Sequence, residues 1–174
     1  MNPAAQAPPR WLPGALAALL CLLASVAAHG SEVYLLRHAE KEPDLPDPGL
    51  TAAGRQRTEH WAAWFAGLGI TEVWSTDYRR TRDTARPIAR AAGVALHFYD
   101  PDKPRQFVAR LQASPAAKAV VVGHSNTLPE LAALLCACPV APMDDAEHDR
   151  LMLIRSDASG PVLLTRRQAE LALP

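Results

Sequence analysis

The sequence has no excess of either charge: 18 basic and 18 acidic residues give a formal net charge of zero. Without a basic surplus, the chain is not expected to bind nucleic acid or an acidic membrane surface. The residues after the first 28 contain no internal repeat and no low-complexity tract. Hydrophobic residues make up 49% of the 174 positions and charged residues 21%, which is typical of one globular domain of ordinary size.

Cysteine is also scarce, and only Cys136 and Cys138 lie beyond the N-terminal segment. In an oxidising compartment the two thiols could pair, but a spacer of one residue closes a small, strained ring. We therefore favour two small, semi-buried side chains near a helix end over a disulfide. No further His or Cys lies at a spacing that would complete a metal site, so no metal is expected here.

An apolar run lies near the N-terminus of the chain. One basic residue, Arg10, comes before it. Val26 and Ala28 fit the −3 and −1 positions of a signal-peptidase site, so residues 1–28 are expected to be removed and residues 29–174 to form a single domain. The mature protein would then be periplasmic or secreted and have no stable membrane span. The alternative is an uncleaved leader that anchors the protein, but the run is short for a span of about 20 residues.

Short apolar stretches alternate with stretches of helical periodicity over the rest of the chain. Thr51 is a good N-cap for the first helix, and Gly93 is a suitable end for the second. The expected strands are 33–37, 72–75, 95–99, 118–124, 150–156 and 161–167, and the expected helices are 51–66, 80–92, 105–112 and 128–136. This alternation indicates an α/β fold in three layers: a mostly parallel central sheet of about six strands, flanked by helices on both faces.

Polar side chains follow three of these strands at their carboxyl ends, where ligands of such sheets bind. The first strand ends in Arg37-His38, the second is followed by "STDYRRTRDTA" with Arg79 and Arg80, and the fourth ends in "GHSN" with His124. The guanidinium group of arginine can donate two parallel hydrogen bonds to phosphate oxygens. A neutral histidine can attack phosphorus. Taken singly, each motif is more typical of a structural role. Their common location predicts a histidine nucleophile beside arginines that bind the phosphate.

Four blocks, "LLRHAEK", "GLTAAGRQR", "STDYRRTRDTA" and "VVVGHSN", resemble in order and spacing those of the histidine phosphatase superfamily, also called phosphoglycerate mutase-like. The resemblance is greatest to its small bacterial members, which include phosphohistidine phosphatases. It implies catalysis through a phosphohistidine, with neither metal nor cofactor. Arg37 and His38 match the R-H pair, which makes His38 the nucleophile. Arg80 matches the arginine of the second-helix block better than Arg79 does, and His124 matches the second histidine, which stabilises the transferring phosphoryl group.

The sequence departs from this pattern after the third strand, where many members carry a glutamate that protonates the leaving group. The corresponding stretch, "HFYDPDKPRQF", has no glutamate. Asp100 is the candidate general acid, and Asp102 is an alternative, although both also fit turns before proline. The lack of a strong acid suits a good leaving group such as a phosphoramidate.

Two residues beside the motifs have open roles. Ser125 is a candidate for contact with phosphate, although it also fits a role in shaping the turn together with Asn126. Glu40 either orients Arg37 or is simply exposed.

Three functions fit these observations. The first is an exported phosphatase that acts on a phosphorylated small molecule or an envelope sugar phosphate. The second is a phosphoglycerate-type mutase, which we disfavour because the general acid is uncertain and phosphoglycerates are cytoplasmic. The third is a phospho-ligand-binding protein without turnover, which the intact set of Arg37, His38, Arg80 and His124 argues against. The sequence names neither the substrate nor the oligomeric state.

Overall fold

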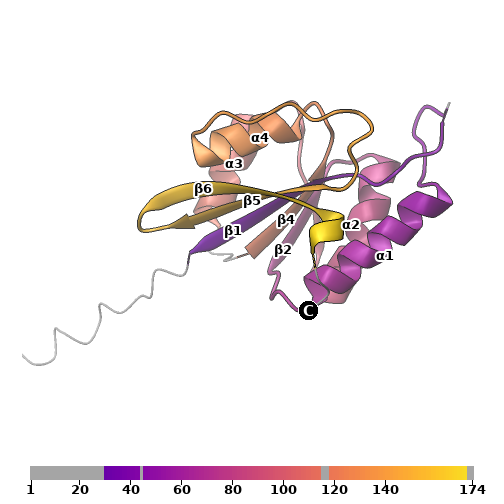
Figure 1. The fold of residues 1–174 in the computed structure, drawn as a ribbon, viewed down its shortest axis with the longest axis horizontal. Helices are drawn as coiled ribbons and strands as arrows, with labels where there is room; N and C mark the ends of the chain where they lie inside the picture. The colour runs from indigo at the N-terminus through magenta and orange to yellow at the C-terminus, as the bar shows by residue number, and fades with distance from the viewer. Residues whose placement is uncertain (1–29, 44, 115–117, 172–174) are drawn as a thin grey trace, which may run out of the picture.

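The computed structural model describes residues 30–43, 45–114 and 118–171 (Figure 1). The expected signal peptide, residues 1–28, lies outside the described residues. Within them, no helix combines the length and the hydrophobicity that crossing a membrane requires.

Six strands form one mixed sheet in the order β3-β2-β4-β1-β5-β6. The four strands β1, β2, β3 and β4 are parallel, whereas β5 runs antiparallel to β1 and β6 antiparallel to β5. Their bounds are Ser31–Arg37 (β1), Glu72–Ser75 (β2), Leu96–Phe98 (β3), Lys118–Gly123 (β4), Arg150–Asp157 (β5) and Gly160–Arg167 (β6). The mostly parallel sheet is confirmed, and β3 is shorter than expected because only three residues pair with β2.

Four helices cover the two faces of this sheet, as expected, with α1 and α2 on one face and α3 and α4 on the other (Figure 1). Their bounds are Ala52–Ala66 (α1), Arg79–Ala92 (α2), Pro104–Ala113 (α3) and Leu128–Cys136 (α4). Strand β4 is buried on both faces: Val120 packs with Trp61 and Phe65, and Val121 packs with Phe107 and Leu131. Burial of each large apolar side chain contributes about 1.5–3 kcal/mol.

The helix ends follow the sequence signals. The Thr51 hydroxyl accepts a hydrogen bond from the backbone N–H of Gly54 at 3.0 Å, and Gly93 closes α2 with φ +69°. Gly54 is also required by packing, because a Cβ there would lie 2.3 Å from the backbone oxygen of Glu40. The start of α1 therefore rests directly on the segment that follows β1. The short 3₁₀ helix at Gln168–Glu170 was not predicted.

The two cysteines correct one expectation, because Cys136 and Cys138 form a disulfide. Ala137, between them, adopts the left-handed conformation with φ +51° and ψ +37°, which turns the chain at the end of α4. The two Cα atoms lie 5.1 Å apart, a separation that a disulfide spans. The favoured interpretation of two unpaired side chains, which rested on the strain expected of so small a ring, was wrong.

Candidate active site

Neighbouring parallel strands bring the two motif histidines together. Arg37, the last residue of β1, lies opposite Gly123, the last residue of β4, and the backbone N–H of His38 donates to the Gly123 carbonyl at 3.0 Å. His38 and His124, which follow these strands, have ring centroids 5.5 Å apart. Both are buried, with 2% and 8% of their surfaces exposed. The sheet therefore places two imidazoles side by side at its carboxyl edge.

The His38 ring is held in one tautomer. Its Nδ1 lies 2.8 Å from the carbonyl oxygen of Ala39, and a carbonyl only accepts, so the proton is on Nδ1. Nε2 therefore carries a lone pair. Burial, as the largest effect, and the nearby positive charges of Arg37 and Arg80 together lower the pKa of His38 to about 3, against the opposing bond to Ala39. At neutral pH the ring is a neutral imidazole with a nucleophilic Nε2.

His124 is fixed through both of its nitrogens. Its Nδ1 lies 3.4 Å from Nη2 of Arg80, and its Nε2 lies 2.9 Å from Oγ1 of Thr76. Because a guanidinium only donates, Nδ1 accepts from Arg80 and Nε2 donates to the threonine hydroxyl. Burial lowers the pKa of His124 to about 4, with a further contribution from Arg80. Tyr78 packs edge-on against the His124 ring, and its own ring carries the Arg80 guanidinium 4.6 Å from its centroid.

Arg37 faces the same site and is held from the opposite side by the loop before β5. Its Nη1 donates to the carbonyl oxygens of Asp144 and Asp145, and its Nη2 lies 3.4 Å from the Asp145 carboxylate. The same carboxylate accepts a hydrogen bond of 2.6 Å from the Ser125 hydroxyl. Ser125 thus contacts Asp145, which links it to Arg37; its contact with phosphate stays a prediction.

Two donors of this site have no protein partner. The Nε–H groups of Arg37 and Arg80 are buried and make no hydrogen bond to any described residue. Buried polar groups are seldom left without a partner, and such exceptions call for an explanation. Two guanidinium groups with spare donors, beside two neutral imidazoles, are suited to bind a phosphoryl group.

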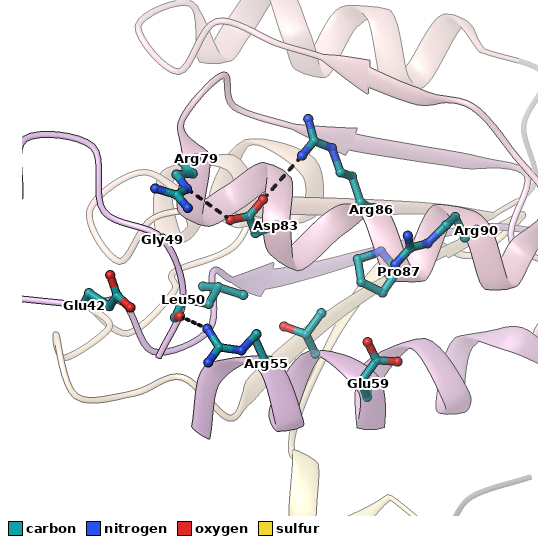
Figure 2. A pocket seen from close by; sticks show the side chains of 11 residues that line it. Glu42, Gly49, Leu50, Arg55, Glu59, Arg79, Asp83, Arg86, Pro87 and Arg90 are labelled. Carbon is teal, nitrogen blue, oxygen red and sulfur yellow. Dashed lines mark hydrogen bonds and ion pairs between the residues drawn. The ribbon is translucent and has the colours of Figure 1, made fainter. Parts of the chain in front are cut away.

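Arg79 points away from this site, which agrees with the choice of Arg80 as the motif arginine. The Arg79 side chain is 58% exposed and lies 3.7 Å from the Asp83 carboxylate. Figure 2 shows both in a cleft of about 420 Å³ between α1 and α2, which is also lined by Arg55, Arg86 and Arg90. Consecutive residues at the start of a helix project about 100° apart, so only one of the two arginines reaches His124.

Asp100, the expected general acid, is engaged elsewhere. Its carboxylate lies 2.9 Å from the Lys103 ammonium and accepts a hydrogen bond from the backbone N–H of Asp102. The hydrogen bond from Lys103 lowers the pKa of Asp100, so the carboxyl is ionised at neutral pH. Asp100 lines a separate small cleft of about 280 Å³ together with Trp74 and Phe98. The structure therefore does not bring it to His38, and its catalytic role stays a prediction.

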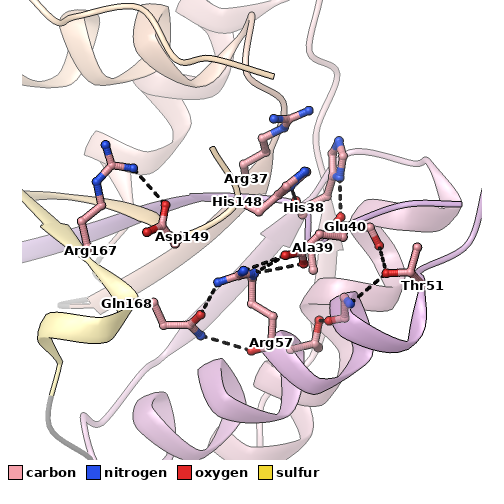
Figure 3. Close-up of polar contacts among 12 residues, drawn as sticks. Arg37, His38, Ala39, Glu40, Thr51, Arg57, His148, Asp149, Arg167 and Gln168 are labelled. Atoms are coloured by element: carbon pink, nitrogen blue, oxygen red, sulfur yellow. Dashed lines mark hydrogen bonds and ion pairs between the residues drawn. The ribbon is translucent and has the colours of Figure 1, made fainter. Parts of the chain in front are cut away.

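Side chains behind the site fix the segment that carries His38. The Thr84 hydroxyl on α2 accepts from the backbone N–H of Ala39 at 3.0 Å. Glu40 neither orients Arg37 nor is fully exposed: it pairs with Arg57 on α1 at 2.6 Å, and Arg57 also binds Gln168 (Figure 3). The segment after β1 is thus attached to both helices of one face.

A third histidine, which the sequence did not single out, lies on the other side of His38. His148 precedes β5, and its ring centroid is 5.7 Å from that of His38. Its Nδ1 lies 2.9 Å from the His38 carbonyl oxygen. Figure 3 shows the His148 side chain next to those of Arg37 and His38. No motif marks this position, because only the return of β5 alongside β1 places it there.

The two buried histidines predict a loss of stability in acid. Their pKa values in the folded protein, about 3 and about 4, lie below the value of 6.5 that an unfolded chain has. The unfolded state therefore binds more protons between these values, and the free energy of unfolding falls as pH decreases through this window. Each histidine contributes a slope of at most about 1.4 kcal/mol per pH unit.

Denaturant titrations between pH 7 and pH 4 measure this slope. His124→Ala is expected to flatten the slope relative to wild type, whatever its effect on absolute stability. His60→Ala, at an exposed position of α1, serves as the control and should leave the slope unchanged. A slope that His124→Ala does not alter would mean that folding does not lower the pKa of His124.

Comparison with known proteins agrees with this geometry. A family model described as "Histidine phosphatase superfamily (branch 1)" matches residues 33–101, the segment that carries Arg37, His38 and Arg80. Residues 33–101 are thus similar in sequence to the histidine phosphatase superfamily. Proteins described as "Probable phosphoglycerate mutase GpmB", from Escherichia coli strains and Shigella boydii, are 39% identical over 74 residues. That match covers 38% of this chain and only 34% of the length of these relatives.

Two solved structures share the fold over most of the chain. The protein histidine phosphatase SixA, complexed with tungstate, superposes with a TM-score of 0.69 at 19% identity, covering 81% of this chain and 99% of SixA. A mycobacterial glucosyl-3-phosphoglycerate phosphatase gives a TM-score of 0.62 at 17% identity and covers 79% of this chain and 98% of that protein. At these identities the likeness concerns the fold alone. SixA is covered almost in full, so the described fold corresponds to nearly the whole of that protein.

Proposed function

We propose that this protein is a phosphatase that hydrolyses a phosphomonoester or a phosphoramidate through a covalent phosphohistidine on His38. The observation that carries this proposal is the state of His38: a buried, neutral imidazole whose Nε2 keeps its lone pair, next to Arg37 and Arg80. A neutral nucleophile beside two fixed cations is the arrangement that attack on a phosphate dianion needs.

The proposed reaction uses two half-reactions. In the first, His38 Nε2 forms a bond to phosphorus as the bond to the leaving group breaks, and the leaving group departs with the electron pair. In the second, water attacks phosphorus and the N–P bond breaks, which returns the electron pair to Nε2. Arg37 and Arg80 hold the phosphoryl oxygens, where negative charge is concentrated during both transfers. His124 joins them when its Nε2–H exchanges the Thr76 hydroxyl for a phosphoryl oxygen.

Hydrolysis is favoured over a mutase reaction by the placement of the acidic groups. A mutase must protonate and later deprotonate sugar hydroxyls, which are poor leaving groups, and the expected acid Asp100 is paired with Lys103 instead. The nitrogen group of a phosphoramidate can leave without a strong acid to protonate it. The fold likeness to a protein histidine phosphatase is consistent with such a substrate, whereas the name of the curated relatives is consistent with the mutase.

The same proposal covers location and substrate. We place the mature protein in the periplasm or outside the cell, because the first 28 residues have the features of a cleaved signal peptide. An exported phosphatase meets phosphates of the cell envelope, such as those on sugar phosphates or on organic phosphates that are taken up. A screen of phosphorylated metabolites against the mature protein identifies the substrate.

Processing is tested directly on the exported protein. N-terminal sequencing is expected to find a chain that begins at His29, after cleavage at Ala28. A protein that still begins at Met1 and stays with the membrane fraction would make the leader an anchor instead.

The reaction class is tested with a chromogenic aryl phosphate and, in parallel, with phosphoglycerate. We expect phosphate release from the aryl ester, with unchanged rates in EDTA, because Arg37 and Arg80 repel a divalent cation. No group of three or more His, Cys, Asp or Glu side chains suited to a metal ion occurs among the described residues. Isomerisation of phosphoglycerate without release would favour the mutase. Phosphate binding without either reaction would favour a binding protein, and activity that EDTA removes and one added metal restores would exclude this mechanism.

A further inference from the structure

Hydrolysis of a phosphohistidine needs a group that takes a proton from the attacking water, and the four motif residues do not supply one. His38 carries the phosphoryl group at this stage. His124 has both nitrogens engaged, with Arg80 on one side and Thr76 on the other. Arginine side chains have no basic nitrogen at neutral pH. The base must therefore come from outside the motif.

Three described acidic side chains that could be considered, Asp145, Glu40 and Asp100, are poorly suited to this task. Asp145 has an exposed carboxylate that accepts from Ser125 and pairs with Arg37. The hydrogen bond from Ser125 and the charge of Arg37 lower the pKa of Asp145, which makes it a weak base. Glu40 is bound by Arg57, and Asp100 is bound by Lys103.

His148 has the free nitrogen that the other groups lack. Because the His38 carbonyl only accepts, the hydrogen bond of 2.9 Å places the proton of His148 on Nδ1 and leaves the lone pair on Nε2. The ring is nearly as close to His38 as that of His124, with centroid distances of 5.7 Å and 5.5 Å. The hydrogen bond also fixes the His148 ring relative to the nucleophile.

We propose that His148 is the general base of phosphohistidine hydrolysis in this protein. Its Nε2 accepts one proton from water while the water oxygen bonds to phosphorus and the N–P bond at His38 breaks. The products are inorganic phosphate, neutral His38 and protonated His148, which then releases its proton to solvent. His148 lines a cleft of about 480 Å³ together with Arg57, His60, Asp149 and Gln168, which gives that proton a way out. This inference rests on the proposed phosphohistidine intermediate.

The charges around His148 keep it available as a base. Arg37 from the end of β1 and Arg57 from α1 disfavour its protonation, while Glu40 and the His38 carbonyl favour it. Asp145, on the same loop, also lies close enough to interact with it. Burial is the largest effect, and the pKa of His148 is lowered overall, so the ring is neutral at pH 7. A base with a pKa below the working pH is ready to accept a proton.

The experiment follows the loss of label from the phosphoenzyme after a chase with unlabelled substrate. His148→Asn keeps an amide donor for the His38 carbonyl but has no basic nitrogen, and His148→Ala removes both. We expect both variants to become labelled on His38 and to lose the label about 10²-fold more slowly, or slower still, than wild type. Added imidazole should speed the loss in His148→Ala. His60→Ala, in the same cleft, should behave like wild type.

Each other outcome has a defined meaning. If His148→Asn loses label at the wild-type rate while His148→Ala is slow, then His148 only positions the His38 backbone and the inference is wrong. Failure of both variants to become labelled, while wild type does, also overturns it, because the base would then act before the intermediate. A wild-type protein that hydrolyses esters but never carries label on histidine contradicts the proposed function itself.

Discussion

His38→Ala is expected to abolish phosphoryl transfer and to leave no labelled intermediate. The substitution removes the buried imidazole whose Nε2 keeps a lone pair beside Arg37 and Arg80, and His124 cannot replace it because both of its nitrogens are hydrogen-bonded. Removal of a nucleophile costs more than removal of a stabilising donor, so we expect a loss well above about 10³-fold. Rapid quench with a labelled phosphate ester measures both the rate of phosphoryl transfer and the amount of labelled enzyme.

The chemistry of the trapped label identifies the nucleophile. A phosphohistidine loses its label in acid and keeps it in base. His124→Ala serves as the comparison, because it should slow the reaction but leave His38 able to accept the phosphoryl group. Turnover near the wild-type rate in His38→Ala, or label on a serine or an aspartate, would show that the nucleophile has been assigned wrongly.

The parts of the site that lie on parallel strands could be predicted from the sequence. Arg37, His38 and His124 directly follow apolar stretches, and the carboxyl ends of neighbouring parallel strands meet at one edge of the sheet. Arg80 required one further step, since Arg79 has the same chemistry one position earlier. The helix geometry then turns Arg80 toward His124 and leaves Arg79 with Asp83.

The residues that the sequence missed reach the site through long-range topology. His148 and Asp145 lie between α4 and β5, in a stretch with no periodic pattern, and both reach the site because β5 returns antiparallel beside β1. Nothing in the local sequence sets the order of strands in a sheet. Thr76 lies inside a quoted motif, but its bond to His124 depends on how β2 and β4 pair.

Two other expectations depended on local backbone geometry. The Cys136–Cys138 disulfide requires Ala137 in a left-handed conformation, which is uncommon for a residue other than glycine, asparagine or aspartate. Asp100 was considered as an acid because it follows β3, but Lys103 lies three residues further along the chain, just before α3, and binds its carboxylate. Loop position alone did not distinguish a catalytic carboxylate from one that pairs with its neighbour.

Arg80→Ala and His124→Ala are each expected to lower kcat/KM by roughly 10²–10³-fold, about 3–4 kcal/mol of transition-state stabilisation. Arg80 offers a buried Nε–H without a protein partner, and His124 faces the same space. Arg79→Ala is the matched control: it removes the same charge one residue earlier, from a side chain that points into the α1–α2 cleft, and should leave kcat/KM almost unchanged. Arg80→Lys keeps the charge but not the two-pronged donor, so it should recover only part of the loss.

The double variant distinguishes two independent donors from one connected unit. Because Arg80 donates to Nδ1 of His124 at 3.4 Å, removal of the arginine also frees the imidazole to rotate. The combined loss in Arg80→Ala/His124→Ala should therefore be smaller than the product of the two single losses, by a factor that corresponds to about 0.5–3 kcal/mol of coupling. Steady-state kinetics of the four proteins measure this factor. If the two single losses simply multiply in the double variant, then the two side chains act separately. An Arg79→Ala variant as slow as Arg80→Ala would mean that Arg79, not Arg80, binds the phosphate.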